Sequence, residues 1–223
     1  MIIFGIICGD FALSGLFNLH VFAPVIIISL LCIQYARKLG QKEAFLFGTY
    51  GGMFFTVLIF ILFVFGDPSS FTFGGETSYF KFSEWTAFTA LFLILMAFRG
   101  GFMNVNTSIL IPMVADCADY EVARTGKYLP GMIGAMFTCV DKIITSLTTV
   151  IVGALVLMAG HSEFPSVNTP YSAELFWIGM ICFCGLPMFS WIINIVCMRY
   201  YPLNKAKMAE VQEAIREAKE RQG

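Results

Sequence analysis

Residues 115–131, "ADCADYEVARTGKYLPG", interrupt an otherwise apolar chain with five charged side chains. They are Asp116, Asp119, Glu121, Arg124 and Lys127. Apolar runs lie on both sides, over residues 85–112 and 132–159, and each is long enough to cross a bilayer, for which about 20 residues suffice. A charged interval between two such runs is typical of a loop outside the membrane, so we expect residues 115–131 to connect two membrane-spanning helices.

The composition of the whole chain also indicates an integral membrane protein. Of its 223 residues, 58% are hydrophobic and 13% are charged, whereas a soluble domain carries roughly a quarter of charged residues. A soluble fold has no surface for so much apolar material, and the net charge of −1 offers no basic surface for nucleic acid. Because irregular backbone cannot face lipid, the fold class that we expect is an all-α membrane bundle.

The apolar runs predict five full transmembrane helices and the end of a sixth within residues 1–200. Residues 1–9 are apolar but too short to span a bilayer, so they read as the end of a helix. The five full spans are expected at residues 17–35, 44–65, 85–112, 132–159 and 174–200. In the last of these, Pro187 predicts a kink.

Basic residues predict how this bundle is oriented. The turn at residues 37–42, the charged interval at 115–131 and the segment from Arg199 onward together hold eleven Lys and Arg residues, whereas the opposite loops hold only Lys81. Cytoplasmic loops carry such an excess of Lys and Arg. We therefore expect these three segments, including the C-terminus, to lie in the cytoplasm, and the protein to cross the plasma membrane several times.

The tail, residues 201–223, is predicted to form a cytoplasmic amphipathic helix. Met208, Val211 and Ile215 share one helical face, and Glu217 and Arg221 stand four residues apart, where opposite charges can pair. Two interpretations stay open for this helix: it docks a partner or regulates the protein, or it is a solvated end beside the membrane.

Lys142 is a basic residue near the middle of a predicted span, and Thr138 and Thr145 share its helical face. A charged residue at the centre of the bilayer costs about 2.5–3.5 kcal/mol on insertion scales, so it normally faces the bundle interior or a water-filled cavity. Asp141 lies about 100° round the helix, so we do not expect it to face Lys142 directly. Lys142, Thr138 and Thr145 thus form a polar stripe along one face of the helix. This stripe predicts a solute or ion pathway, because hydrogen bonding between helices would explain the hydroxyl groups but not the lysine.

Arg99 is the second basic residue inside a span, and Asn106 lies seven residues further along the same face. Gly100 and Gly101 follow it and allow another helix to approach closely. Two interpretations stay open for Arg99: an interior ion pair, for which Asp141 is a candidate, or a contact with a substrate.

Several kinds of chemistry find no support in the sequence. The seven cysteines form no CxxC pair, and His20 and His161 stand far apart, so we expect no metal site and no cofactor. A Ser–His–Asp set, a zinc motif and a Gly-rich phosphate loop are all missing. We therefore do not expect an enzyme.

The charged interval and the helix after it, "MIGAMFTCVDKIITSL", resemble the signature region of the glycoside–pentoside–hexuronide:cation symporters, a major-facilitator family that includes the melibiose permease. That family carries an acidic Asp-x-x-Asp-Tyr start, a Thr-Gly-basic turn, a Gly, and then a helix with a Lys. The matching positions here are Asp116, Asp119, Tyr120, Thr125, Gly126, Lys127, Gly131 and Lys142. The turn "ARKLGQKEAF" also looks like the short basic turn between helices eight and nine of that family.

The resemblance implies the C-terminal six-helix half of a twelve-helix transporter, with the N-terminal half as a missing partner. It implies symport of a sugar or glycoside with Na⁺ or H⁺ across the lipid bilayer. Lys142 and Thr138 would then line the central cavity, and the cytoplasmic acids and Arg124 would help to close an inner gate by pairing with neighbouring loops. The alternative from another class is a membrane scaffold or accessory subunit without transport activity.

Overall fold

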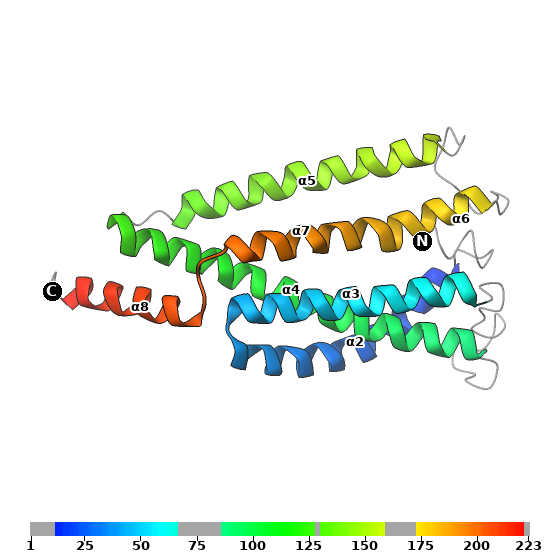
Figure 1. The fold of residues 1–223 in the computed structure, drawn as a ribbon, viewed down its shortest axis with the longest axis horizontal. Helices are drawn as coiled ribbons and strands as arrows, with labels where there is room; N and C mark the ends of the chain where they lie inside the picture. The colour runs from blue at the N-terminus through cyan, green and yellow to red at the C-terminus, as the bar shows by residue number, and fades with distance from the viewer. Residues whose placement is uncertain (1–11, 67–85, 128–129, 159–172, 221–223) are drawn as a thin grey trace.

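A computed structural model of the chain describes residues 12–66, 86–127, 130–158 and 173–220. Within these ranges the secondary structure is entirely helical (Figure 1). The elements are α2 (Ala12–Leu39), α3 (Gln41–Phe65), α4 (Ala87–Thr125), α5 (Pro130–Met158), α6 (Ala173–Met180), the π-helical turn η3 (Ile181–Gly185), α7 (Leu186–Tyr200) and α8 (Lys205–Glu220). The partial helix expected at residues 1–9 lies outside the described residues.

Four helices of the described chain are long and apolar enough to cross a membrane. They are α3, α4, α5 and the continuous run Phe176–Tyr200 through α6, η3 and α7. The apolar part of α2 that can be judged, Phe22–Tyr35, is shorter than a full span. The described residues therefore support four of the five full spans that we expected.

Helix α4 is the central element, because it contacts α2, α3, α5 and α8. It begins after Thr86, whose hydroxyl oxygen accepts a hydrogen bond from the backbone N–H of Thr89 at 3.2 Å, and it ends at Gly126, whose φ of 71° closes the last turn in the left-handed region. Glycine adopts this conformation without steric cost.

The charged interval is helical up to Thr125, not a loop, which corrects the expectation from sequence. The helix passes through Pro112, because a single proline removes only one backbone hydrogen bond and membrane helices tolerate it. With 39 residues at 1.5 Å each, α4 is about 58 Å long, roughly twice the hydrocarbon thickness. Its charged final turns therefore extend beyond the part that a bilayer can cover.

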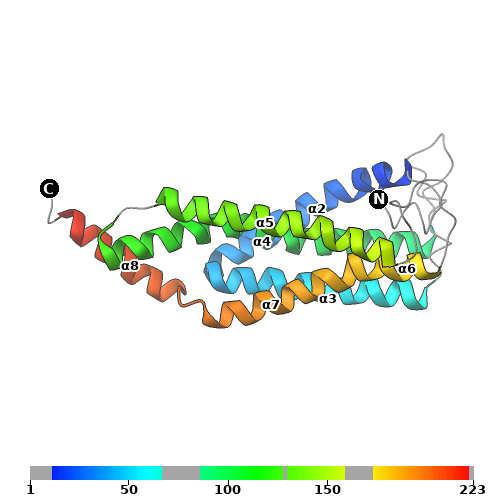
Figure 2. The same ribbon diagram turned by 90° about the horizontal axis from the view of Figure 1, so that it is seen from above.

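Helix α4 packs closely against both α3 and α2, whereas α2 and α3 diverge from the turn that joins them (Figures 1 and 2). A Cβ atom added at Gly51 of α3 would overlap the ring of Phe102 in α4, so the absence of a side chain sets the separation of these helices. Further along α3, a buried cluster joins this helix to α4 and to the last span through Ile59, Phe92 and Met180.

The last span contains a π-helical turn at Ile181–Gly185, directly before Pro187. Proline has no N–H to donate, and its ring crowds the carbonyl four residues earlier, which belongs to Phe183. A wider turn relieves this crowding, and π-helical turns are often found at functional positions. The sequence placed a kink at Pro187; the structure has the irregular turn just before it.

Helix α8 packs against the outer end of α4, at the end of the molecule that carries the C-terminus (Figure 1). Val211 is only 4% exposed, and Gln212 Nε2 donates a 2.7 Å hydrogen bond to Asp119 Oδ2. Lys42 Nζ, at the start of α3, donates to the Tyr201 carbonyl oxygen at 2.6 Å. The three basic segments thus meet at one end of the bundle.

Candidate functional site

Helix α5 lies at the outer edge of the bundle (Figure 1) and contacts the rest of the chain through α4 and α6. Of its described residues only Val156 is buried. Cβ atoms added at Gly131, Gly134 or Gly153 would meet nothing within 4 Å. The described part of the chain therefore leaves most of the surface of α5 uncovered.

Lys142 and Asp141 form an exposed ion pair on α5. Lys142 Nζ lies 3.8 Å from Asp141 Oδ2, and the two side chains are 75% and 53% exposed. We expected that these neighbours would not face each other, because their Cα positions are about 100° apart. The expectation was wrong, because the flexible four-carbon stem of lysine reaches across that angle.

The hydroxyl groups of the stripe bond to their own helix. Thr138 Oγ1 donates to the Gly134 carbonyl oxygen at 2.9 Å, and Thr145 Oγ1 donates to that of Asp141 at 2.8 Å. Ser146 makes the same type of bond to Lys142. Within the described residues these hydroxyl groups do not join α5 to another helix, although each oxygen keeps a free lone pair that can accept from a ligand.

Arg99 is buried between α4, α3 and the π-helical turn. Its side chain is 8% exposed, its Nε donates to Thr56 Oγ1 at 2.9 Å, and its guanidinium carbon lies 4.7 Å from the centre of the Phe183 ring. The candidate ion pair with Asp141 is not formed, because Asp141 lies on α5 and pairs with Lys142. In place of a carboxylate, a hydroxyl group and an aromatic face hold this charge.

Asn106, about two turns beyond Arg99 on α4, also bonds to α3. Its Nδ2 donates to Thr49 Oγ1 at 3.1 Å, while its buried Oδ1 has no hydrogen-bond partner among the described residues. On the other side of α4, Asn104 Nδ2 donates to Ser29 Oγ of α2 at 2.9 Å. The polar residues of α4 thus fasten it to two helices, and the structure does not bring Arg99 or Asn106 to the stripe on α5.

The residues expected to form a cytoplasmic gate lie on the last turns of α4 and just after them. Arg124 pairs with Glu121 of the same helix at 3.3 Å. Asp119 accepts its hydrogen bond from Gln212 of α8, not from a neighbouring loop. Tyr120 and Asp116 lie on these turns as well, and Gly126 and Lys127 follow them.

Tyr201, which follows α7, completes the seam between α4 and the tail. Its hydroxyl group lies 3.9 Å from the Cys117 sulfur. Burial, followed by the neighbouring Cys117 and Asp116, raises the pKa of Tyr201 above its usual value, so the phenol stays neutral at physiological pH.

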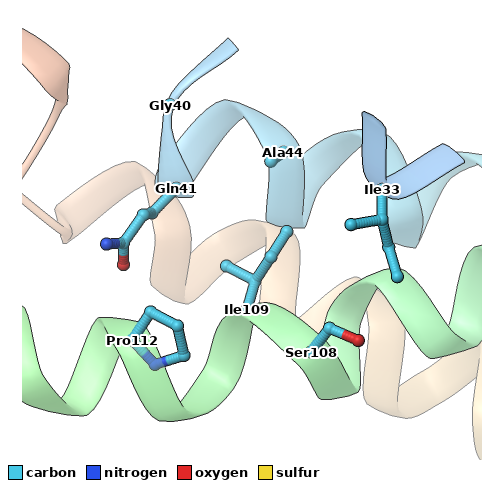
Figure 3. A pocket seen from close by; sticks show the side chains of 7 residues that line it. All are labelled: Ile33, Gly40, Gln41, Ala44, Ser108, Ile109 and Pro112. Carbon is cyan, nitrogen blue, oxygen red and sulfur yellow. The ribbon is translucent and has the colours of Figure 1, made fainter. Parts of the chain in front are cut away.

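A cavity of about 340 Å³ lies between α2, α3 and α4 near this seam (Figure 3). Its lining residues are Ile33, Gly40, Gln41, Ala44, Ser108, Ile109 and Pro112. Gln41 extends from the first turn of α3 toward Pro112 (Figure 3), and its buried Oε1 has no partner among the described residues. The sequence did not single out this cavity, because small and apolar residues from three helices form it and carry no local pattern.

The described residues contain no group of three or more His, Cys, Asp or Glu side chains that could hold a metal ion. What the geometry does provide is an exposed charged stripe in a spanning helix and a separate buried polar network that fastens α4.

Comparisons with known proteins give one family. No curated protein and no solved structure matches the chain. A family model described as "MFS/sugar transport protein" matches residues 6–205, which is most of the chain and includes all the helices long enough to span a membrane. The chain therefore belongs to the MFS/sugar transport protein family of the major facilitator superfamily and is a multi-pass membrane protein.

Proposed function

We propose that the chain is the C-terminal half of a cation-coupled symporter for a sugar or glycoside, of the glycoside–pentoside–hexuronide type. The family match supports sugar transport, and the signature from Asp116 to Lys142 supports the finer assignment. In this proposal the protein lies in the plasma membrane. Its basic end, which includes α8, faces the cytoplasm, in accordance with the excess of Lys and Arg there.

The exposed ion pair of Lys142 and Asp141 is the observation that carries the proposal. Lys142 lies twelve residues after the start of α5, or about 18 Å along a helix that needs about 30 Å to cross the hydrocarbon core. Exposed to lipid at that depth, the ammonium group would be costly. It therefore faces water, or a second protein surface that encloses water.

A second six-helix bundle against α5 satisfies this requirement. In transporters built from two repeats, substrate and ion sites lie near the middle of the bilayer, at the interface between the repeats. The uncovered stripe of α5 would form one wall of such a site. Thr138 and Thr145 would offer hydroxyl oxygens to a sugar, and Lys142 would hold the negative charges of the site in place.

Coupling follows from the charges at the same wall. A Na⁺ or H⁺ that binds beside Asp141 would favour occupancy by the sugar, and the sugar would favour the cation equally, typically by about 1–3 kcal/mol. We assign Arg99 and Asn106 to the support of α4, the helix against which α5 packs, because both side chains bond α4 to α3. The gate residue Asp119 would act together with Gln212 of α8.

The test is uptake of labelled sugars, with and without Na⁺, by the complete transporter carrying Lys142→Ala. We expect coupled accumulation to be lost while the protein stays in the membrane at a normal level. Ile144→Ala serves as the matched control, because Ile144 is exposed on the apolar side of the same helix and its loss should leave accumulation unchanged. Normal accumulation by Lys142→Ala would remove this residue from the mechanism.

The same assay separates the transporter from a membrane scaffold. A scaffold would give no saturable uptake of any sugar with the unmodified protein, whichever bundle accompanies it. The charged outer face of α8 already forms pairs within the helix, such as Lys207 with Glu210 at 2.7 Å, and its apolar face already packs on the bundle. Among the described residues of the tail, the apolar side chain of Val211 is therefore already covered by the bundle and is not offered to a partner.

A further inference from the structure

An open groove of about 400 Å³ lies between α3 and the last span, on the side of the π-helical turn. Val57 and Phe60 of α3 form part of one wall, and Ile181 and Gly185 of η3 form part of the other. Thr56 is also part of the lining, and its hydroxyl oxygen is already engaged with Arg99. The exposed lining is otherwise almost entirely apolar.

The composition of both walls favours lipid as the occupant of this groove. Both walls belong to helices that can cross a membrane, and the rim residues Val57, Phe60 and Ile181 are each about two-fifths or more exposed. Beyond the groove, Phe189 and Ile192 of the last span are exposed apolar residues as well. An ordered water needs two to four polar partners, which this lining does not offer.

We propose that one acyl chain of a membrane phospholipid occupies this groove as a bound ligand, not as exchanging bulk lipid. Gly185 leaves space in the wall that η3 forms: a Cβ there would meet only Ile181, at 3.7 Å. Trp177, the second residue of the run Phe176–Tyr200, also belongs to the lining. Near the end of a span its indole N–H can donate to a lipid headgroup.

Occupation of the groove bears on the buried cation. Thr56 lines the groove, and its hydroxyl oxygen accepts a hydrogen bond from Arg99 Nε at 2.9 Å. Thr56 is 0% exposed, so the protein itself already shields this bond, and an acyl chain would add an apolar layer outside it.

The test uses the protein in nanodiscs that contain a phosphatidylcholine with a diazirine on its acyl chain, followed by mapping of the labelled peptides. We expect labels to concentrate on the groove residues of α3 and η3 and to be sparse on Phe189 and Ile192. Gly185→Leu places a side chain in the groove without a backbone clash and should reduce labelling of the groove residues severalfold. Val196→Leu, on the exposed face of α7 outside the groove, should leave the labelling pattern unchanged.

Three results would overturn the proposal. Equal labelling of all lipid-facing residues would mean bulk lipid only, and absence of labels from the groove would mean that protein covers it. Groove labelling that survives Gly185→Leu would place the lipid elsewhere. If Gly185→Leu does not fold, Val57→Trp fills the groove from the opposite wall, and the same reduction is required of it.

Discussion

The hydrogen bond between Arg99 and Thr56 allows a sharp test of how α4 is held in the bundle. Replacing Thr56 by Val keeps the shape of the side chain but removes the acceptor of the bond at 2.9 Å. Hydrogen bonds to charged groups contribute about 1.5–3 kcal/mol in proteins, whereas bonds between membrane helices average about 0.6 and reach about 1.7 kcal/mol. Arg99 is charged and only 8% exposed, so we expect a loss near the upper membrane value.

The measurement is the free energy of unfolding in mixed micelles, for Thr56→Val, Arg99→Met and the double variant. A loss of about 1.4 kcal/mol would change the equilibrium constant of unfolding tenfold. Residues in contact show coupling energies of about 0.5–3 kcal/mol, so Thr56→Val should cost much less once Arg99 is already Met. The cation–π contact with Phe183 is intact in the Thr56→Val single variant, so the cycle isolates the hydrogen bond.

Two results would refute this reasoning. An equal cost of Thr56→Val in both backgrounds would mean that the hydroxyl group acts on something other than Arg99. A cost close to zero in the unmodified background would mean that water or lipid headgroups reach the guanidinium and replace the bond.

Two further predictions concern packing. Gly51→Leu should destabilise the protein by about 1–3 kcal/mol, the usual cost of overpacking, because the new side chain would overlap Phe102. The control Gly153→Leu, where the glycine has free space around it, should leave the melting temperature unchanged. Equal effects of the two substitutions would contradict the close approach of α3 and α4. Val211→Asp should detach α8 from the bundle and speed limited proteolysis of the tail. Ala214→Asp should not, because Ala214 is exposed. If the tail is cut at the same rate in both variants, α8 is not docked on the bundle.

The apolar runs of the sequence predicted the positions of the main helices because about 20 apolar residues have one stable arrangement in lipid. They could not predict that α4 continues to Thr125. The acidic segment has polar residues on all sides and so resembles a loop, yet α8 packs against this end of α4 and Gln212 of α8 donates a hydrogen bond to Asp119. This support comes from a segment more than 80 residues away, which no local pattern reveals.

The candidate site on α5 stays a prediction, although the helix on which it was placed is present. The sequence grouped Lys142, Thr138 and Thr145 correctly on one face, because helical periodicity fixes which side chains are neighbours. It could not tell which of the two basic residues inside the spans, Lys142 or Arg99, pairs with Asp141. The structure shows that Lys142 pairs with Asp141, because it is adjacent in sequence and has a flexible side chain. Arg99 lies on another helix, where it donates a hydrogen bond to Thr56 and contacts the Phe183 ring.

The most direct test of the account is a cysteine scan of α5 in membranes, with a membrane-impermeant thiol reagent and its permeant analogue. Single cysteines at Thr138, Lys142 and Thr145 should react with the impermeant reagent, and an excess of the transported sugar should slow the reaction. Cysteines at Val140 and Ile144 should react with both reagents much more slowly than cysteines at the three stripe positions. If position 142 is as inert as 140 and 144, the stripe faces no wet passage and the proposed transport site is wrong.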